Sequence, residues 1–134
     1  MVSIGSDINR IVAWTQRCSF AYHADEAAEV DALNDISCAI PQIAILCGQS
    51  GCGKTTYTRL LNGLIPGFYS GDLQGIHMTC GIRAGLAPVE SYVGQVGSVF
   101  QNPKTQYFNA DSTDELAFPC ENTGMSPARI RQRV

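Results

Sequence analysis

The chain has 134 residues, of which 45% are hydrophobic and 16% are charged, and its net charge is −3. This composition is ordinary for one globular domain and excludes a disordered chain. No run approaches the roughly 18 apolar residues that span a bilayer, and the N-terminus lacks a secretion signal, so we expect a cytoplasmic protein. The acidic balance argues against a nucleic-acid partner, and the C-terminal arginines are expected on a solvated helix face. These arginines are Arg129, Arg131 and Arg133.

The six cysteines form no C-x-x-C pair, so the sequence indicates neither a zinc site nor a thioredoxin-type redox pair. A reducing compartment is expected, and most of the cysteines are predicted to be small core residues. They are Cys18, Cys38, Cys47, Cys52, Cys80 and Cys120.

Strands are predicted throughout the first part of the chain. Residues 10–22 mix β-branched and aromatic residues with polar ones, which is typical of a half-exposed antiparallel sheet. Residues 25–31 form an acidic connection. Residues 36–40 alternate apolar with small or polar side chains and end at Pro41, so they predict another strand.

The most specific motif is the sequence GQSGCGKT at residues 48–55, which fits G-x-x-x-x-G-K-[ST]. Such a loop surrounds the phosphates of a nucleoside triphosphate with backbone N–H groups. Lys54 would reach the β- and γ-phosphates, Thr55 would bind Mg²⁺, and Thr56 would donate toward the α-phosphate. The candidate phosphate-binding residues are Gly48, Gln49, Ser50, Gly51, Cys52, Gly53, Lys54, Thr55 and Thr56.

The segments on both sides of this motif favour a phosphate loop over a chance Gly-rich turn. Residues 43–46 are wholly apolar, which predicts a strand buried on both faces of a parallel sheet. After the loop, Tyr57, Leu60, Leu61 and Leu64 recur at helical spacing and predict an amphipathic helix.

Cys52 lies inside the loop at a predicted helix N-terminus, where positive potential lowers the pKa of a thiol. Two interpretations remain open from the sequence. The thiol is either mildly reactive or an inert side chain that the loop tolerates.

Three further elements are predicted between this helix and residue 100. Residues 73–82 predict a bulged strand or a strand pair, residues 88–92 one helical turn, and residues 96–100 another core strand.

Two helices are predicted near the C-terminus. Ser112 and Glu115 fit a capping box that opens a short helix, which ends at Phe118 because Pro119 interrupts it. Ser126 and Pro127 supply an N-cap and an N1 proline for a last helix.

Several segments resemble the ATPases of ABC transporters. Residues 99–103, VFQNP, resemble the Q-loop of that family. The sequences QYFN at residues 106–109 and DELAF at residues 114–118 resemble its energy-coupling-factor branch, which contains cobalt- and vitamin-type importers. Residues 19–22 and 32–37 are similar to the opening strands of the same family.

The resemblance implies roles for individual residues. Gln101 would contact Mg²⁺ and the attacking water, so Lys54 and Gln101 would serve hydrolysis; alternatively, Gln101 is a turn-capping amide. Tyr22 would stack on the adenine of ATP or would merely pack. Asp114 and Glu115 would lie near the contact with a membrane subunit, or they would only favour a helix N-terminus.

Other elements that the resemblance implies are missing from the sequence. Hydrolysis needs an apolar strand that ends in Asp-Glu, and the family also has a Leu-Ser-Gly-Gly-Gln signature and a switch histidine. We therefore interpret residues 1–134 as the N-terminal half of an α/β P-loop NTPase domain of the ABC type. It would comprise an antiparallel β subdomain and the start of the RecA-like core, and it would be marginally stable alone.

Three functional hypotheses follow. The first is the ATP-binding subunit of an energy-coupling-factor importer, which would use ATP and Mg²⁺ to drive uptake of a small solute such as a metal ion or vitamin. It would pair with a second ATPase subunit and bind a transmembrane coupling subunit at the inner face of the membrane. The second is a soluble P-loop kinase or switch, and the third a truncated, inactive nucleotide-binding module.

Overall fold

A computed structural model describes residues 11–23 and 30–134, which belong to two compact units, one ending at Val96 and the other running from Gly97 to Val134. Residues 25–29 of the predicted acidic connection lie outside the described residues, whereas Asp31 belongs to a strand. Each unit is described below by itself.

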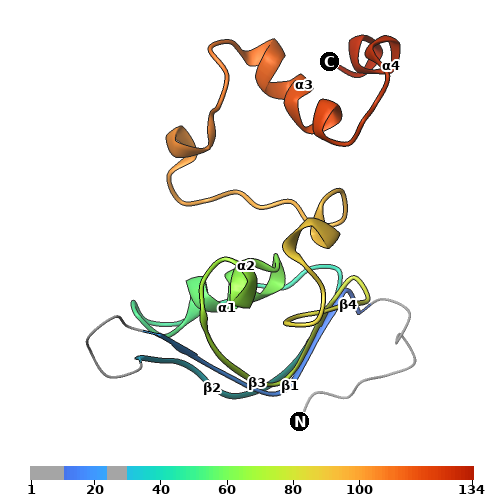
Figure 1. The fold of residues 1–134 in the computed structure, drawn as a ribbon. Helices are drawn as coiled ribbons and strands as arrows, with labels where there is room; N and C mark the ends of the chain where they lie inside the picture. The colour runs from blue at the N-terminus through green and yellow to red at the C-terminus, as the bar shows by residue number, and fades with distance from the viewer. Residues whose placement is uncertain (1–10, 24–29) are drawn as a thin grey trace. The chain divides into compact units, whose positions relative to one another are not determined.

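The first unit is built on an antiparallel sheet, as predicted, with the described strands in the order β2-β1-β3-β4 (Figure 1). The strands are β1 (Ala13–Tyr22), β2 (Val30–Ile40), β3 (Gly71–Thr79) and β4 (Ile82–Arg83). The predicted strand at residues 36–40 is therefore the second half of a longer one. The prediction of a strand pair in residues 73–82 is confirmed.

A bulge bends the sheet in the middle of β1. Its register against β2 shifts between Thr15 and Cys18, and Arg17 has a positive φ of 48°. Opposite this point, Gly75 has φ 79°, and a Cβ there would lie 2.1 Å from the carbonyl oxygen of Arg17. Only glycine satisfies both conditions, so Gly75 fixes the place of the bulge.

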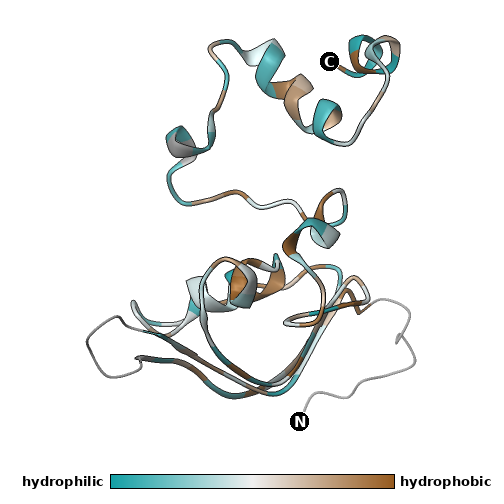
Figure 2. Ribbon diagram, in the orientation of Figure 1, coloured by the Kyte–Doolittle hydropathy of each residue, from teal (hydrophilic) through white to brown (hydrophobic). Residues whose placement is uncertain are grey.

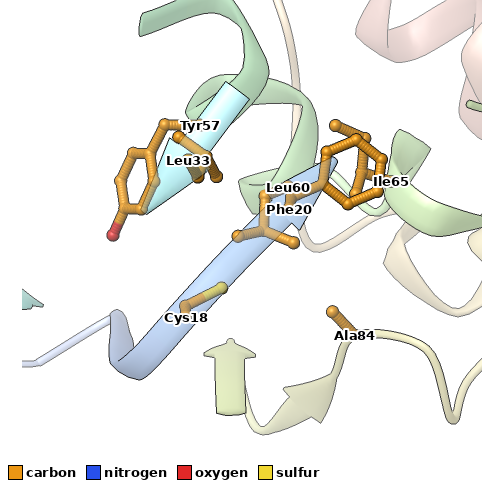
Figure 3. Close-up of a cluster of buried hydrophobic side chains, with 7 residues drawn as sticks. All are labelled: Cys18, Phe20, Leu33, Tyr57, Leu60, Ile65 and Ala84. Carbon is orange, nitrogen blue, oxygen red and sulfur yellow. The ribbon is translucent and has the colours of Figure 1, made fainter. Parts of the chain in front are cut away.

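Helices α1 (Lys54–Leu61) and α2 (Leu64–Gly67) cover one face of the curved sheet (Figure 1). The buried face of α1 carries Tyr57 and Leu60, which confirms the predicted apolar stripe. Figure 3 shows these two side chains with residues from β1, β2, α2 and the segment after β4. The core cluster consists of Cys18, Phe20, Leu33, Tyr57, Leu60, Ile65 and Ala84.

Two predicted core strands are absent from the structure, so these predictions are wrong. Residues 43–46 are extended but unpaired coil, with Ile43 87% and Ile45 86% exposed. Residues 96–100 form no strand, and Val99 is 92% exposed. An apolar run indicates a tendency to be buried, but a strand also needs neighbours for its N–H and C=O groups. No described strand pairs with either run.

A 3₁₀ turn, η2 (Val89–Tyr92), lies near the end of the first unit and confirms the helical turn predicted at residues 88–92. Tyr92 is buried there against Gly63. A Cβ at residue 63 would lie 2.4 Å from the Tyr92 ring, so this close packing requires glycine.

The second unit contains η3 (Pro103–Gln106), α3 (Ser112–Asn122) and α4 (Pro127–Arg133). Figure 2 shows that α3 is hydrophobic in its middle and hydrophilic at both ends. Ser126 is the N-cap of α4 and Pro127 its first residue, as predicted. The predicted solvated arginine face is confirmed on α4, where all three arginines are exposed.

The predicted start and end of α3 are both wrong. The N-cap is Asp111, whose carboxylate accepts a hydrogen bond of 2.9 Å from the Asp114 N–H, so Ser112 opens no capping box. The helix also continues through Pro119 to Asn122. A proline removes one helical hydrogen bond, and in this helix that loss comes within one turn of the end.

The cysteines differ from the prediction that most would be buried. All six are free, but only Cys18 is buried and Cys120 is half-buried. The exposed ones lie on the edge strand β2, in the segment before α1 and in the turn after β3, where the small size of cysteine is no advantage. They are Cys38, Cys47, Cys52 and Cys80.

No helix in the described part of the chain is both long and apolar enough to cross a membrane.

Candidate functional site

The loop at residues 48–53 enters α1 through a left-handed glycine. Gly53 has φ 86° and is the N-cap of α1, where no side chain accepts a hydrogen bond from the first turn. The Gly53 carbonyl accepts the first helical bond from the Tyr57 N–H at 2.8 Å. The first turn of α1 therefore offers N–H groups and a positive helix end, and it contains no acidic residue. Such an end is suited to bind an anion.

Lys54 adds a full positive charge at this end of the helix. Its ammonium donates to the carbonyl oxygen of Gly48 at 2.8 Å and to that of Gln49. It also lies 3.6 Å from the Cys52 sulfur. The side chain thus folds back over the loop that it follows, and the charge stands over the loop. Loop, helix end and ammonium together form a cationic cradle of the kind that phosphate groups fill.

The two threonines at the start of α1 lie in different environments. Thr55 is exposed, and its carbonyl accepts a hydrogen bond of 2.9 Å from the Thr58 hydroxyl. Thr56 is buried, with 7% of its surface exposed. The described residues contain no group of three His, Cys, Asp or Glu side chains that could hold a metal ion. The Thr55 hydroxyl therefore fits Mg²⁺ as a single protein ligand, with nucleotide oxygens supplying others.

Tyr22 lies at the end of β1 and reaches α1 with its hydroxyl. Its half-buried ring makes edge contacts with Phe20, at a centroid distance of 4.9 Å, and with Tyr69, at 6.4 Å. The Tyr22 hydroxyl donates to the Thr56 oxygen at 3.2 Å and accepts from Arg59 at 3.1 Å. The structure therefore brings Tyr22 and Thr56 together, as two candidate residues that are far apart in sequence.

Arg59 and Tyr69 complete this group, and the sequence reasoning did not identify them. The Arg59 guanidinium lies 4.0 Å from the centroid of the Tyr69 ring. An arginine on the helix that follows a phosphate loop and an aromatic residue after that helix carry no local signal of a site. Only the fold shows that both belong to the surroundings of Tyr22.

The layer beneath α1 is electrically neutral. The Tyr57 hydroxyl lies 3.0 Å from the Cys38 sulfur, and burial raises the pKa of Tyr57 well above its ordinary value. Burial also raises the pKa of Cys18 to about 11 and lowers the pKa of His77 to about 4. His77 bonds to Thr79 at 2.8 Å, so it is a packing residue, as predicted. These groups support the helix without adding charge near the loop.

Gln101 is an exposed residue of the second unit. The side chains that hold the backbone near it are those of its neighbours. The Gln106 side chain accepts from the Phe100 N–H at 3.2 Å and donates to the Ser98 carbonyl at 3.3 Å. The Asn102 carbonyl oxygen accepts from the Lys104 N–H at 3.2 Å.

Glu115 holds the segment before α3. One of its carboxylate oxygens accepts from the N–H groups of Phe108, at 3.0 Å, and Asn109, at 2.9 Å, and from the Asn109 side chain. The Phe108 ring stacks on Phe118, with centroids 5.3 Å apart. The sequence pattern identified Glu115 as half of a capping box, whereas the structure shows that its carboxylate organises residues 108–109.

The chain is similar to curated proteins over most of its length. It is 44% identical to a Treponema denticola protein named "Putative ABC transporter ATP-binding protein", over 118 residues that are 87% of this chain and 24% of that protein. A protein of the same name from Methanosarcina acetivorans is 36% identical over 89% of the chain and 19% of its own length. The chain thus spans about a quarter or less of these relatives.

A third relative carries a more specific name. "Energy-coupling factor transporter ATP-binding protein" of Latilactobacillus sakei is 33% identical over 96% of this chain and 43% of its own length. No family model matches the chain. The relatives imply a P-loop NTPase, and the antiparallel sheet with its helices and phosphate loop agrees with this class. The chain belongs to the family of ABC transporter ATP-binding proteins.

Proposed function

We propose that the chain is part of the ATP-binding subunit of an ABC importer of the energy-coupling-factor type. The observation that carries this proposal is the cradle formed by Lys54, the loop at residues 48–53 and the N-terminus of α1. The name of the Latilactobacillus sakei relative and the VFQNP and DELAF sequences support the importer branch. The first unit would be the antiparallel β subdomain with the beginning of the RecA-like core.

Binding of ATP would begin with its phosphates. The loop N–H groups and the Lys54 ammonium would replace the water around the β- and γ-phosphates. To do so, the ammonium would exchange its bonds to the Gly48 and Gln49 carbonyls for bonds to phosphate oxygens. Thr56 would donate to the α-phosphate, and Tyr22 would stack on the adenine. Bound Mg²⁺, held by Thr55, would neutralise phosphate charge.

Hydrolysis and coupling would involve residues outside this cradle. Gln101 would orient the attacking water and contact Mg²⁺. A second ATPase subunit would complete the site, and a transmembrane coupling subunit would transmit closure to the uptake of a small solute such as a metal ion or vitamin. Asp114 and Glu115 would lie near that membrane subunit. The protein would then be peripheral on the cytoplasmic face of the membrane.

The test compares the two lysines of the chain, Lys54 and Lys104. We expect Lys54→Ala to weaken binding of Mg-ATP about 10- to 100-fold, because it removes charge-assisted hydrogen bonds to phosphate. Lys104→Ala, which removes the same charge from η3, should change the Kd less than about twofold. Isothermal titration calorimetry of the full chain measures both values. Equal affinity of wild type and Lys54→Ala would refute nucleotide binding at this loop.

A further inference from the structure

Three polar side chains connect the end of β1 to the first turn of α1. An N–H of Arg59 donates to the Tyr22 oxygen at 3.1 Å, and the Tyr22 hydroxyl donates to the Thr56 oxygen at 3.2 Å. The Arg59 guanidinium is also held over the Tyr69 ring at 4.0 Å. We call Arg59, Tyr22 and Thr56 the relay.

The relay has a direction because a guanidinium can only donate hydrogen bonds. The Tyr22 oxygen must accept from Arg59, and its single proton is then given to Thr56. The Thr56 oxygen therefore accepts, and its own proton is left to donate elsewhere. A charged donor at the head strengthens the bonds behind it. Without Arg59, the Tyr22 oxygen could instead accept the Thr56 proton, which would withdraw it from a phosphate.

We propose that Arg59 is a positioning residue of the nucleotide site, which acts through Tyr22 to fix the adenine-stacking ring and to keep the Thr56 hydroxyl as a phosphate donor. This inference rests on the proposed function, since it assumes ATP in the cradle. Arg59 lies on the same helix as Lys54, so the packing of one short helix sets both the phosphate contacts and the orientation of Tyr22. The Tyr69 ring restrains the guanidinium in the position that this requires.

The test is a double-mutant cycle with Mg-ATP as the probe, measured by titration calorimetry on the full chain. Arg59→Met keeps the length of the side chain but removes the donor, and we expect it to weaken binding about fivefold. Arg59→Lys keeps a donor and should recover part of this loss. In the Tyr22→Phe background, where the relay is already cut, Arg59→Met should change the Kd less than about twofold. Arg83→Met, on β4, is the matched control and should bind like wild type.

Each other outcome has a definite meaning. Full additivity of Arg59→Met and Tyr22→Phe would show that Arg59 does not act through Tyr22, and it would overturn the inference. An unchanged Kd in Arg59→Met would overturn it as well, while a weakened Lys54→Ala variant would leave the proposed function standing. If wild type and Lys54→Ala bind Mg-ATP equally, both fail. Circular dichroism melts without nucleotide identify a variant that is merely unfolded at the titration temperature.

Discussion

Gly53 lies so close to Ala32 on β2 that a Cβ at residue 53 would stand 2.4 Å from the Ala32 carbonyl oxygen. Gly53 also has φ 86°, which disfavours any other residue. We therefore predict that Gly53→Ala destabilises the fold by more than about 2 kcal/mol, because backbone strain and the clash add. Urea denaturation followed by circular dichroism measures the change.

Gly51 is the matched control for this prediction. It has nearly the same φ, 80°, but no atom lies within 4 Å of the position that its Cβ would occupy. Gly51→Ala should therefore cost only about 1 kcal/mol, the price of the φ angle. If the two variants are equally destabilised, the contact with Ala32 does not limit residue 53, and glycine is needed there for its φ angle alone.

His77 predicts a stability that depends on pH. It is 1% exposed, and burial lowers its pKa from the ordinary 6.5 to about 4 in the folded protein. Between these values the unfolded chain binds a proton that the folded protein does not. The free energy of unfolding is therefore unaffected above about pH 6.5, falls as the pH drops below it, and has lost up to about 3 kcal/mol near pH 4.

Urea midpoints measured from about pH 7 down to pH 4 test the His77 prediction. His77→Leu should flatten the pH dependence, whatever it does to stability at neutral pH. His23→Gln, which changes the exposed histidine near Asp72, is the control and should keep the wild-type slope in this range. A wild-type slope in His77→Leu would assign the pH dependence to other groups.

Glu115 predicts the local stability of the segment before α3. Because its carboxylate accepts hydrogen bonds from the Phe108 and Asn109 N–H groups, Glu115→Ala should speed hydrogen exchange of these amides about tenfold. Glu121→Ala removes an exposed carboxylate near the end of the same helix and should leave both rates unchanged. Amide exchange followed by NMR measures the rates, and equal behaviour of the two variants would contradict the role of Glu115.

The parts of the fold that the sequence predicted correctly depend on local signals. Alternation gave the antiparallel strands, and the glycine pattern around Lys54 gave the loop and the start of α1. The apolar runs at residues 43–46 and 96–100 predicted strands that are absent, because pairing depends on neighbouring strands that a run does not specify.

The contacts within the candidate site were harder to predict than its phosphate loop. Tyr22 lies 34 residues from Thr56 and 37 from Arg59, and no periodicity relates the three side chains. Glu115 has the spacing of a capping box from Ser112, but a competing acceptor, Asp111, occupies the N-cap. Local patterns specify which residues can cap or bind, whereas tertiary packing selects among them.

Cys52 tests directly what covers the loop. Its thiol is exposed and lies near the Lys54 ammonium, so bound phosphates would cover it. We predict that Mg-ATP slows alkylation of Cys52 by iodoacetamide, which tryptic mass spectrometry measures at each cysteine. Cys80, exposed in the turn after β3, should react at the same rate with and without nucleotide. Unchanged alkylation of Cys52 at saturating Mg-ATP would mean that the nucleotide leaves this part of the loop open, whatever the intrinsic reactivity of the thiol.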